Sequence, residues 1–156
     1  MDFDLFIRWL HIIGACVLFG TGSGIAFFMV MSHKTRNPVL IAHTAGTVVL
    51  ADLLFTATAV VVQPITGVTL AHRIGWPLTE LWVSASLGLY VFAGLFWLPV
   101  VWIQMEMRKL AALAASTQDV LPPRYFKLYR IWFACGFPAF AAVLGIIWLM
   151  ISKPTF

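Results

Sequence analysis

The sequence predicts an all-α integral membrane protein, a single domain of four transmembrane helices over residues 1–156. Hydrophobic residues make up 62% of the chain and charged residues only 10%, whereas an average soluble domain has about 25% charged residues. The mean hydropathy is +0.95. Four apolar stretches each reach the roughly 20 residues that cross the hydrocarbon core of a bilayer. We therefore expect lipid to surround most of the apolar side chains.

The polar and proline-containing segments between these stretches define the expected helices. The polar segment that ends at Pro38 separates the first helix from the second. Gln63-Pro64 is expected to end the second helix, because proline removes a helical hydrogen bond. An alanine-rich stretch at 110–115 can extend the third helix into water. The four helices are thus predicted at about residues 3–31, 39–62, 79–105 and 129–151.

The positive charges predict how the bundle is oriented. Seven of the ten Lys and Arg residues lie in or beside the first and third connections: Lys34, Arg36, Arg108, Lys109, Arg124, Lys127 and Arg130. Positively charged connections stay in the cytoplasm, so both termini are expected on the non-cytoplasmic side. These charges sit at helix ends and form no basic face, which argues against a nucleic-acid partner.

Ionisable residues inside a bilayer are costly and usually functional, and His11 is the first candidate. His11, Gly14, Leu18 and Gly22 share one helix face at the spacing of one turn. The two glycines leave a shallow groove beside the imidazole. Haem iron accepts a neutral imidazole as an axial ligand, and its flat macrocycle needs room, so this row predicts a b-type haem site with His11 as the metal ligand.

A structural interpretation of the same helix stays open. Glycines also let membrane helices approach closely, and Gly20 and Gly24 form a GxxxG pair of that kind, which could join two copies of the chain. His11 would then only form a hydrogen bond across a helix interface.

Asp52 is the second candidate, because it falls near the middle of the second helix with Thr56 one turn later. A charged carboxylate at the bilayer centre costs about 2.5–3.5 kcal/mol. Asp52 could relay protons or bind a cofactor through a hydrogen bond. It could equally form an interhelical hydrogen bond, for example to Thr21 or Ser23.

The other histidines and two prolines are weaker signals. His33, His43 and His72 are expected to be solvated or interfacial; a second axial ligand from His72 would require the second connection to fold back over the bundle. Pro99 and Pro138 are expected to kink the third and fourth helices and could open a pocket there.

Several strings resemble an uncharacterised bacterial inner-membrane family, domain-of-unknown-function family 2269. They are WLHIIGACVLFGTGSGIAFF, VVLADLLFTATAVVVQPITG, WLPVVWIQMEMR and GFPAFAAVLGIIWLM. The resemblance covers almost the whole chain and implies a multi-pass protein of the bacterial inner membrane. It implies no particular activity.

LHII followed by Phe19-Gly20 also resembles, more distantly, the first helix of HemJ-type protoporphyrinogen oxidases and of copper-resistance D-like membrane proteins. In the HemJ type this histidine is a haem ligand, and it corresponds to His11. The chain departs from that type at 26–29, where an arginine is expected, and at 135–137, where Asn-Glu is expected. The likeness therefore implies haem binding more than the oxidase reaction.

These observations favour a haem-binding membrane protein that serves electron transfer or a porphyrin-linked redox step, with Asp52 as a buried polar partner. Two alternatives belong to other classes. One is a small transporter or metal-handling protein that uses Asp52 and the kinked helices. The other is a cofactor-free partner subunit of a membrane complex.

Overall fold

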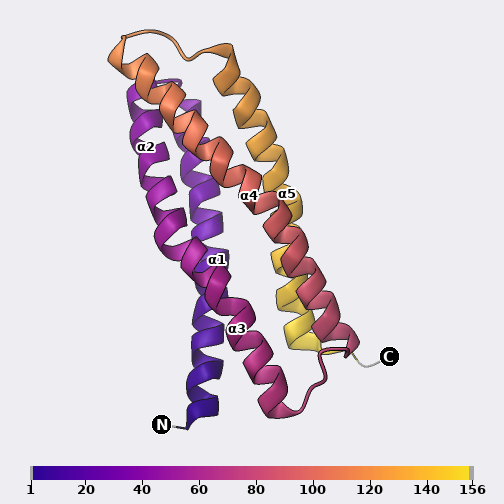
Figure 1. The fold of residues 1–156 in the computed structure, drawn as a ribbon. Helices are drawn as coiled ribbons and strands as arrows, with labels where there is room; N and C mark the ends of the chain where they lie inside the picture. Colours follow the sequence, from indigo (N-terminus) through magenta and orange to yellow (C-terminus); the bar gives the residue numbers. More distant parts are fainter. Residues whose placement is uncertain (1, 155–156) are drawn as a thin grey trace.

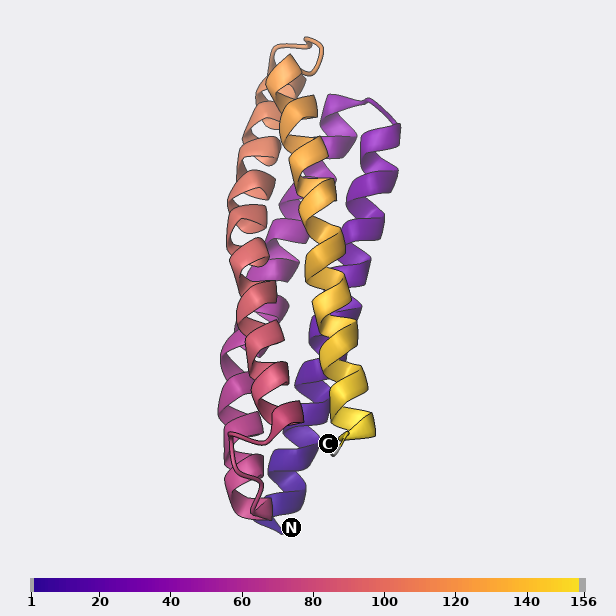
Figure 2. The ribbon, with the colours of Figure 1, turned by 90° about the vertical axis from the view of Figure 1, so that its right-hand side faces the viewer.

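The computed structural model describes residues 2–154 and folds them into a bundle of long helices (Figures 1 and 2). The elements are α1 (Phe3–Lys34), α2 (Pro38–Ala51), the π-helical turn η1 (Asp52–Thr56), α3 (Ala57–Ile74), α4 (Leu81–Ser116) and α5 (Pro123–Ser152). Because α2, η1 and α3 are continuous, residues 2–154 contain four helices long and apolar enough to cross a membrane. Over the described residues there is no strand, and the predicted all-α fold is confirmed.

The two ends of the bundle differ in what they carry. Both termini and the 75–80 connection lie at one end, here called the terminal end (Figure 1). The 35–37 and 117–122 connections lie at the other, here called the basic end because the seven clustered Lys and Arg residues flank or occupy them. The orientation of the two ends relative to the cytoplasm stays a prediction from the distribution of positive charge.

Local sequence explains where the second span begins and ends. The Asn37 side chain accepts hydrogen bonds from Val39 N at 2.9 Å and Leu40 N at 3.4 Å, and Pro38 occupies the first turn of α2. This is a standard N-cap followed by a residue that needs no helical donor. At the other end Gly75 has φ +88°, the left-handed conformation that suits a residue after a helix.

The expected end of the second helix at Gln63-Pro64 is wrong, since α3 continues to Ile74. Pro64 cannot donate to the carbonyl of Val60, four residues earlier, and that carbonyl accepts a hydrogen bond from the Tyr90 hydroxyl of α4 instead. In a membrane, proline inside a helix is tolerated where a neighbouring helix satisfies the freed carbonyl.

Three other helix ends lie beyond the predicted ones. The first helix runs to Lys34, α4 runs on to Ser116 through the alanine-rich stretch that was expected to extend it, and α5 begins at Pro123 instead of near residue 129. In each case helix continues past the apolar stretch into polar sequence, because nothing there breaks it. Pro122 and Pro123, which fix the backbone without needing a donor, start the last helix.

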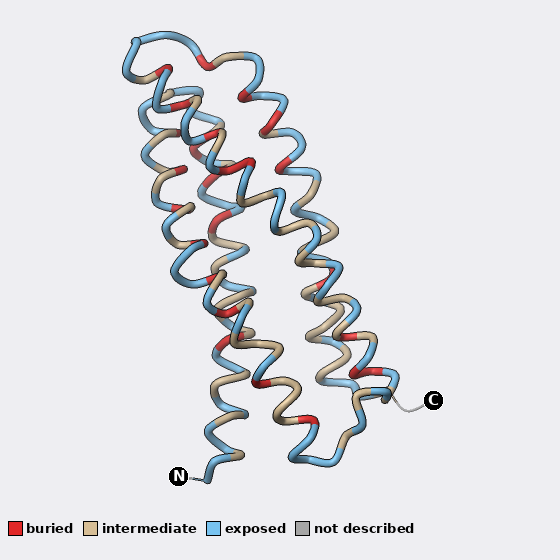
Figure 3. The backbone as a smooth tube through the Cα atoms, viewed as in Figure 1, coloured by how far each residue is buried: buried red, intermediate tan, exposed pale blue. Residues whose placement is uncertain are grey.

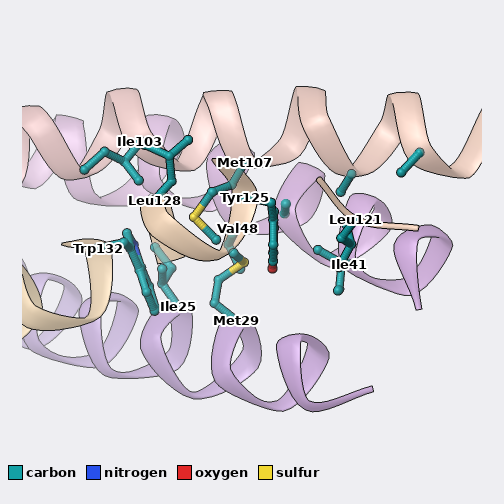
Figure 4. Close-up of a cluster of buried hydrophobic side chains, with 13 residues drawn as sticks. Ile25, Met29, Ile41, Val48, Ile103, Met107, Leu121, Tyr125, Leu128 and Trp132 are labelled. Carbon is teal, nitrogen blue, oxygen red and sulfur yellow. The ribbon is translucent and has the colours of Figure 1, made fainter. Parts of the chain in front are cut away.

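The large buried side chains belong mainly to the half of the bundle toward the basic end, where Figure 3 shows buried positions on neighbouring helices. One cluster of buried residues joins α1, α2, α4 and α5 there, and Figure 4 shows it in close-up. It comprises Ile25, Met29, Ile41, Ala45, Val48, Ile103, Met107, Ala111, Ala114, Leu121, Tyr125, Leu128 and Trp132. This cluster contains most of the large side chains buried inside the bundle. The helices of the terminal half pack against one another mainly through smaller side chains.

Buried residues of the terminal half are mostly small or polar. They include Gly14, Ala59, Thr66, Ala71, Ser86 and Ala142, with Trp82 and Val83 as the larger members. There α1 lies alongside α3, and α4 lies alongside α5 (Figure 1). The His11 site belongs to the α1–α3 pair of this half.

Candidate functional site

His11 makes a specific contact between α1 and α3. Its Nδ1 atom lies 2.8 Å from the Thr66 hydroxyl oxygen, and Thr66 is buried. The Thr66 hydroxyl proton points to carbonyls of its own helix, Val62 O at 2.9 Å and Gln63 O at 3.1 Å. Because that proton is used within α3, the hydroxyl oxygen accepts from His11 Nδ1–H. Nε2 of the neutral imidazole then keeps its lone pair.

The imidazole fits against α3 because residue 67 is a glycine. A Cβ atom at Gly67 would lie 3.1 Å from Cε1 of His11, which is tighter than ordinary van der Waals contact. The absence of a side chain at this position therefore lets the His11 ring approach the α3 backbone. The ring orientation is set from two sides, by the Thr66 hydrogen bond and by Gly67.

The space beside Gly14 is filled by a side chain of α3, whereas the sequence predicted an open groove there. A Cβ at Gly14 would lie 2.6 Å from the terminal amide of Gln63, so the Gln63 side chain fills the space beside this glycine. With its amide nitrogen facing α1, Gln63 donates to His11 O at 2.9 Å and its oxygen accepts from Ala15 N at 3.2 Å. Gly14 thus serves helix packing and does not leave an open groove for a macrocycle.

The remaining members of the predicted row lie further along α1. Leu18 is half-buried, whereas Gly22 is exposed and a Cβ there would have no neighbour within 4 Å. Of the proposed haem-contact residues, His11 and Gly14 contact α3, and Gly22 remains an open position.

Asp52 lies at a second, separate place, the π-helical turn η1. Its side chain is 5% exposed, and Oδ1 accepts a hydrogen bond from Nε1 of Trp97 on α4 at 3.3 Å. The interhelical hydrogen bond considered for Asp52 exists, but its partner is Trp97 and not Thr21 or Ser23. Ser23 donates to Phe19 O within α1.

The structure does not bring Asp52 and His11 together. Thr66, the partner of His11, follows Asp52 by 14 residues in one continuous helical span. At 1.5 Å per residue these two positions lie about 21 Å apart along the helix. Asp52 is therefore not a polar partner of a cofactor held at His11.

The other histidines occupy different surroundings. His33 stacks on Tyr129 with ring centroids 3.5 Å apart and lies 3.3 Å from the Tyr125 hydroxyl. His43 is exposed on α2. His72 is exposed and belongs to α3, not to the connection after it. Within residues 2–154 no three His, Cys, Asp or Glu side chains gather as a metal site would require.

Sequence reasoning missed the partners of both candidate residues. Gln63, Thr66 and Gly67 all belong to the QPITG string, and Trp97 begins the WLPVVWIQMEMR string. Both strings are among those that resemble the membrane family, and this resemblance is the sequence signal that could have pointed to these residues. Nothing in either string alone indicated which residue of α1 or α2 it would contact.

The fold and these contacts define a polytopic α-helical integral membrane protein with polar side chains buried inside its bundle. The family model described as "Predicted integral membrane protein (DUF2269)" matches residues 5–154, and the chain belongs to this family. Searches of curated proteins and of solved structures gave no match.

Proposed function

We propose that the protein binds b-type haem, which His11 would hold through Nε2, and serves electron transfer or a porphyrin-linked redox step. The observation that carries this proposal is the hydrogen bond between His11 Nδ1 and Thr66. Metal-ligating histidines almost always donate their other ring N–H to a neighbouring acceptor, which fixes the tautomer and the ring orientation. The resemblance of the LHII segment to haem-binding membrane proteins supports the same residue.

The chain supplies His11 as a haem ligand, together with contacts that fix the orientation of its ring. Thr66 holds the imidazole in the tautomer that offers Nε2, and Gly67 lets the ring seat against α3. Gln63 ties the backbone of α1 on both sides of Gly14. The Gln63 side chain also occupies the space beside Gly14, where a macrocycle would otherwise lie. Of the two glycines predicted to contact haem, only Gly22 has open space beside it. When bound, haem would supply one-electron chemistry at its iron.

The rest of the proposal concerns location. We place the protein in a bacterial inner membrane with its basic end in the cytoplasm. The support is the clustering of Lys and Arg at that end and the family resemblance of the whole chain. The His11 site then lies in the half of the bilayer away from the cytoplasm.

The visible absorption spectrum of detergent-purified protein titrated with haemin tests the cofactor. We expect a saturable Soret band at one haem per chain, and its loss in His11→Ala. His43→Ala is the matched control, because His43 is an exposed histidine on the neighbouring span. Thr66→Val removes the acceptor of Nδ1–H and should weaken haem binding by about 10–100-fold.

Two results would overturn the haem proposal. One is a wild-type protein that gives no saturable band; the other is a folded His11→Ala protein that keeps it. Either result would leave the His11–Thr66 pair as a contact between two helices and would favour a protein without this cofactor.

A further inference from the structure

The π-helical turn in the second span carries a carboxyl group that the proposed haem site does not use. Asp52 begins η1, and its backbone oxygen accepts from Ala57 N, five residues later, instead of from residue 56. Such a widened turn interrupts the regular helix and is often found at functional sites. Both Asp52 and Thr56 are buried here, at 5% and 6% exposure.

The surroundings of Asp52 hold no positive charge. In the apolar core of the second span, residues 44–71, Asp52 is the one ionisable residue. The other helices offer His11 and Cys16 on α1, Tyr90 on α4 and Cys135 on α5 between their polar ends. Cys16, Tyr90 and Cys135 are not cations, and His11 pairs with Thr66, about 21 Å along the span from Asp52. Among the described residues Asp52 forms no ion pair, and Trp97 donates a hydrogen bond to its carboxyl group.

A charged Asp52 would therefore be poorly stabilised. The donors beside it, the Trp97 indole N–H and the Thr56 hydroxyl, are both uncharged, whereas a buried carboxylate is stabilised best by a paired charge. A neutral carboxyl group removes this problem and gains a donor of its own. The Thr56 hydroxyl lies beside this carboxyl, and its oxygen is buried without a hydrogen-bond partner in the present geometry.

We propose that Asp52, Thr56 and Trp97 form a proton-binding site in the membrane interior, in which the Asp52 carboxyl carries the bound proton. The protonated oxygen donates to the Thr56 hydroxyl, and the other oxygen accepts from Trp97. All three polar groups then have partners. The charged form could also accept from Thr56 and Trp97, but it would leave a carboxylate with no counter-charge in the membrane interior, which the neutral form avoids. This site is independent of haem, because it lies about 21 Å along the span from the partner of His11.

Infrared difference spectroscopy of the full-length protein in lipid tests the proton directly. We expect the wild-type spectrum minus that of Asp52→Asn to contain the C=O band of a neutral carboxylic acid at neutral pH. That band should convert to carboxylate bands as the pH rises. Asp119→Asn is the matched control: Asp119 is exposed at the basic end, so its difference spectrum should show carboxylate at neutral pH.

Trp97→Phe adds a second, directional test. Trp97 stabilises the carboxylate more than the neutral acid, because it donates to the carboxyl oxygen. Without this donor the Asp52 proton should be released at a higher pH than in the wild type. An unchanged release pH would overturn the role of Trp97 in the site.

A chemical measurement on the wild-type chain removes any dependence on variants that fold poorly. A membrane-soluble carbodiimide reacts with neutral carboxyl groups in apolar surroundings, and peptide mapping locates the adduct. We expect modification of Asp52 at neutral pH and its decline at higher pH. Carboxylate bands for Asp52 at neutral pH, or carbodiimide adducts that spare Asp52, would overturn the proposal. Neither outcome depends on whether haem binds His11.

Discussion

The Tyr90 hydroxyl of α4 donates to the Val60 carbonyl, the acceptor that Pro64 leaves unfilled one turn later in α3. This single contact accounts for two features of the fold. It allows the second span to continue through a proline, and it joins α3 to α4 in the half of the bundle that lacks the large buried cluster.

Tyr90→Phe is therefore expected to destabilise the protein by about 0.5–1.5 kcal/mol, the net value of one hydrogen bond. Unfolding in detergent, followed by circular dichroism, measures this loss. In a Pro64→Ala background the alanine N–H fills the Val60 carbonyl, so Tyr90→Phe should cost clearly less. Equal costs in both backgrounds would contradict the assignment. Tyr129→Phe is the control, because it removes a tyrosine hydroxyl at another place in the bundle, where the Tyr129 ring stacks on His33.

Gly14→Ala should destabilise the α1–α3 pair because its methyl group would displace the Gln63 amide. Lost hydrogen bonds to the α1 backbone and overpacking together predict a cost of about 1–2 kcal/mol. Gly88→Ala is the matched control, because a Cβ there meets nothing within 4 Å. That control should be neutral or stabilising by up to about 1 kcal/mol, the helix preference of alanine over glycine.

A combined Gln63→Ala/Gly14→Ala variant separates packing from helix preference. Once the amide is absent, the added methyl group has room, so the second substitution should cost much less than it does alone. Additive losses would show that Gln63 does not act through Gly14.

The sequence predicted the number and type of the spans well, because each span's composition alone is enough to identify it. It failed at Pro64, since whether a membrane helix continues through a proline depends on a donor from another helix, here Tyr90. The same limit applies to the sites. His11 and Asp52 stood out as ionisable residues in apolar stretches, but Thr66 and Trp97 became recognisable only through tertiary contact.

The predicted groove at His11 shows a related limit. Helical spacing placed Gly14 and His11 on one face, but spacing cannot tell an open glycine from one filled by a side chain of the next helix. Gln63 filled Gly14, while Gly22 stayed open. Two glycines with the same pattern thus have different roles.

Gly20 and Gly24 of α1 remain free to receive another helix, because a Cβ at either would meet nothing within 4 Å. We expect this face to join two copies of the chain through close helix contact. Gly20→Leu/Gly24→Leu should then abolish the dimer in chemical cross-linking and in light scattering of the detergent complex. Gly88→Leu, at an open glycine on α4, should leave the dimer intact. A wild-type protein that is monomeric in lipid would contradict the expectation.

The orientation of the bundle can be tested with single cysteines at its two ends. In a background with Cys16 and Cys135 replaced by alanine, Asp119→Cys lies in the connection at the basic end and Leu78→Cys in the connection at the terminal end. The positive-inside rule predicts that a membrane-impermeant maleimide added to spheroplasts labels residue 78 and spares residue 119. After lysis both positions should be labelled, which controls for reactivity. The reverse pattern in intact spheroplasts would invert the topology and move the His11 site to the cytoplasmic half of the membrane.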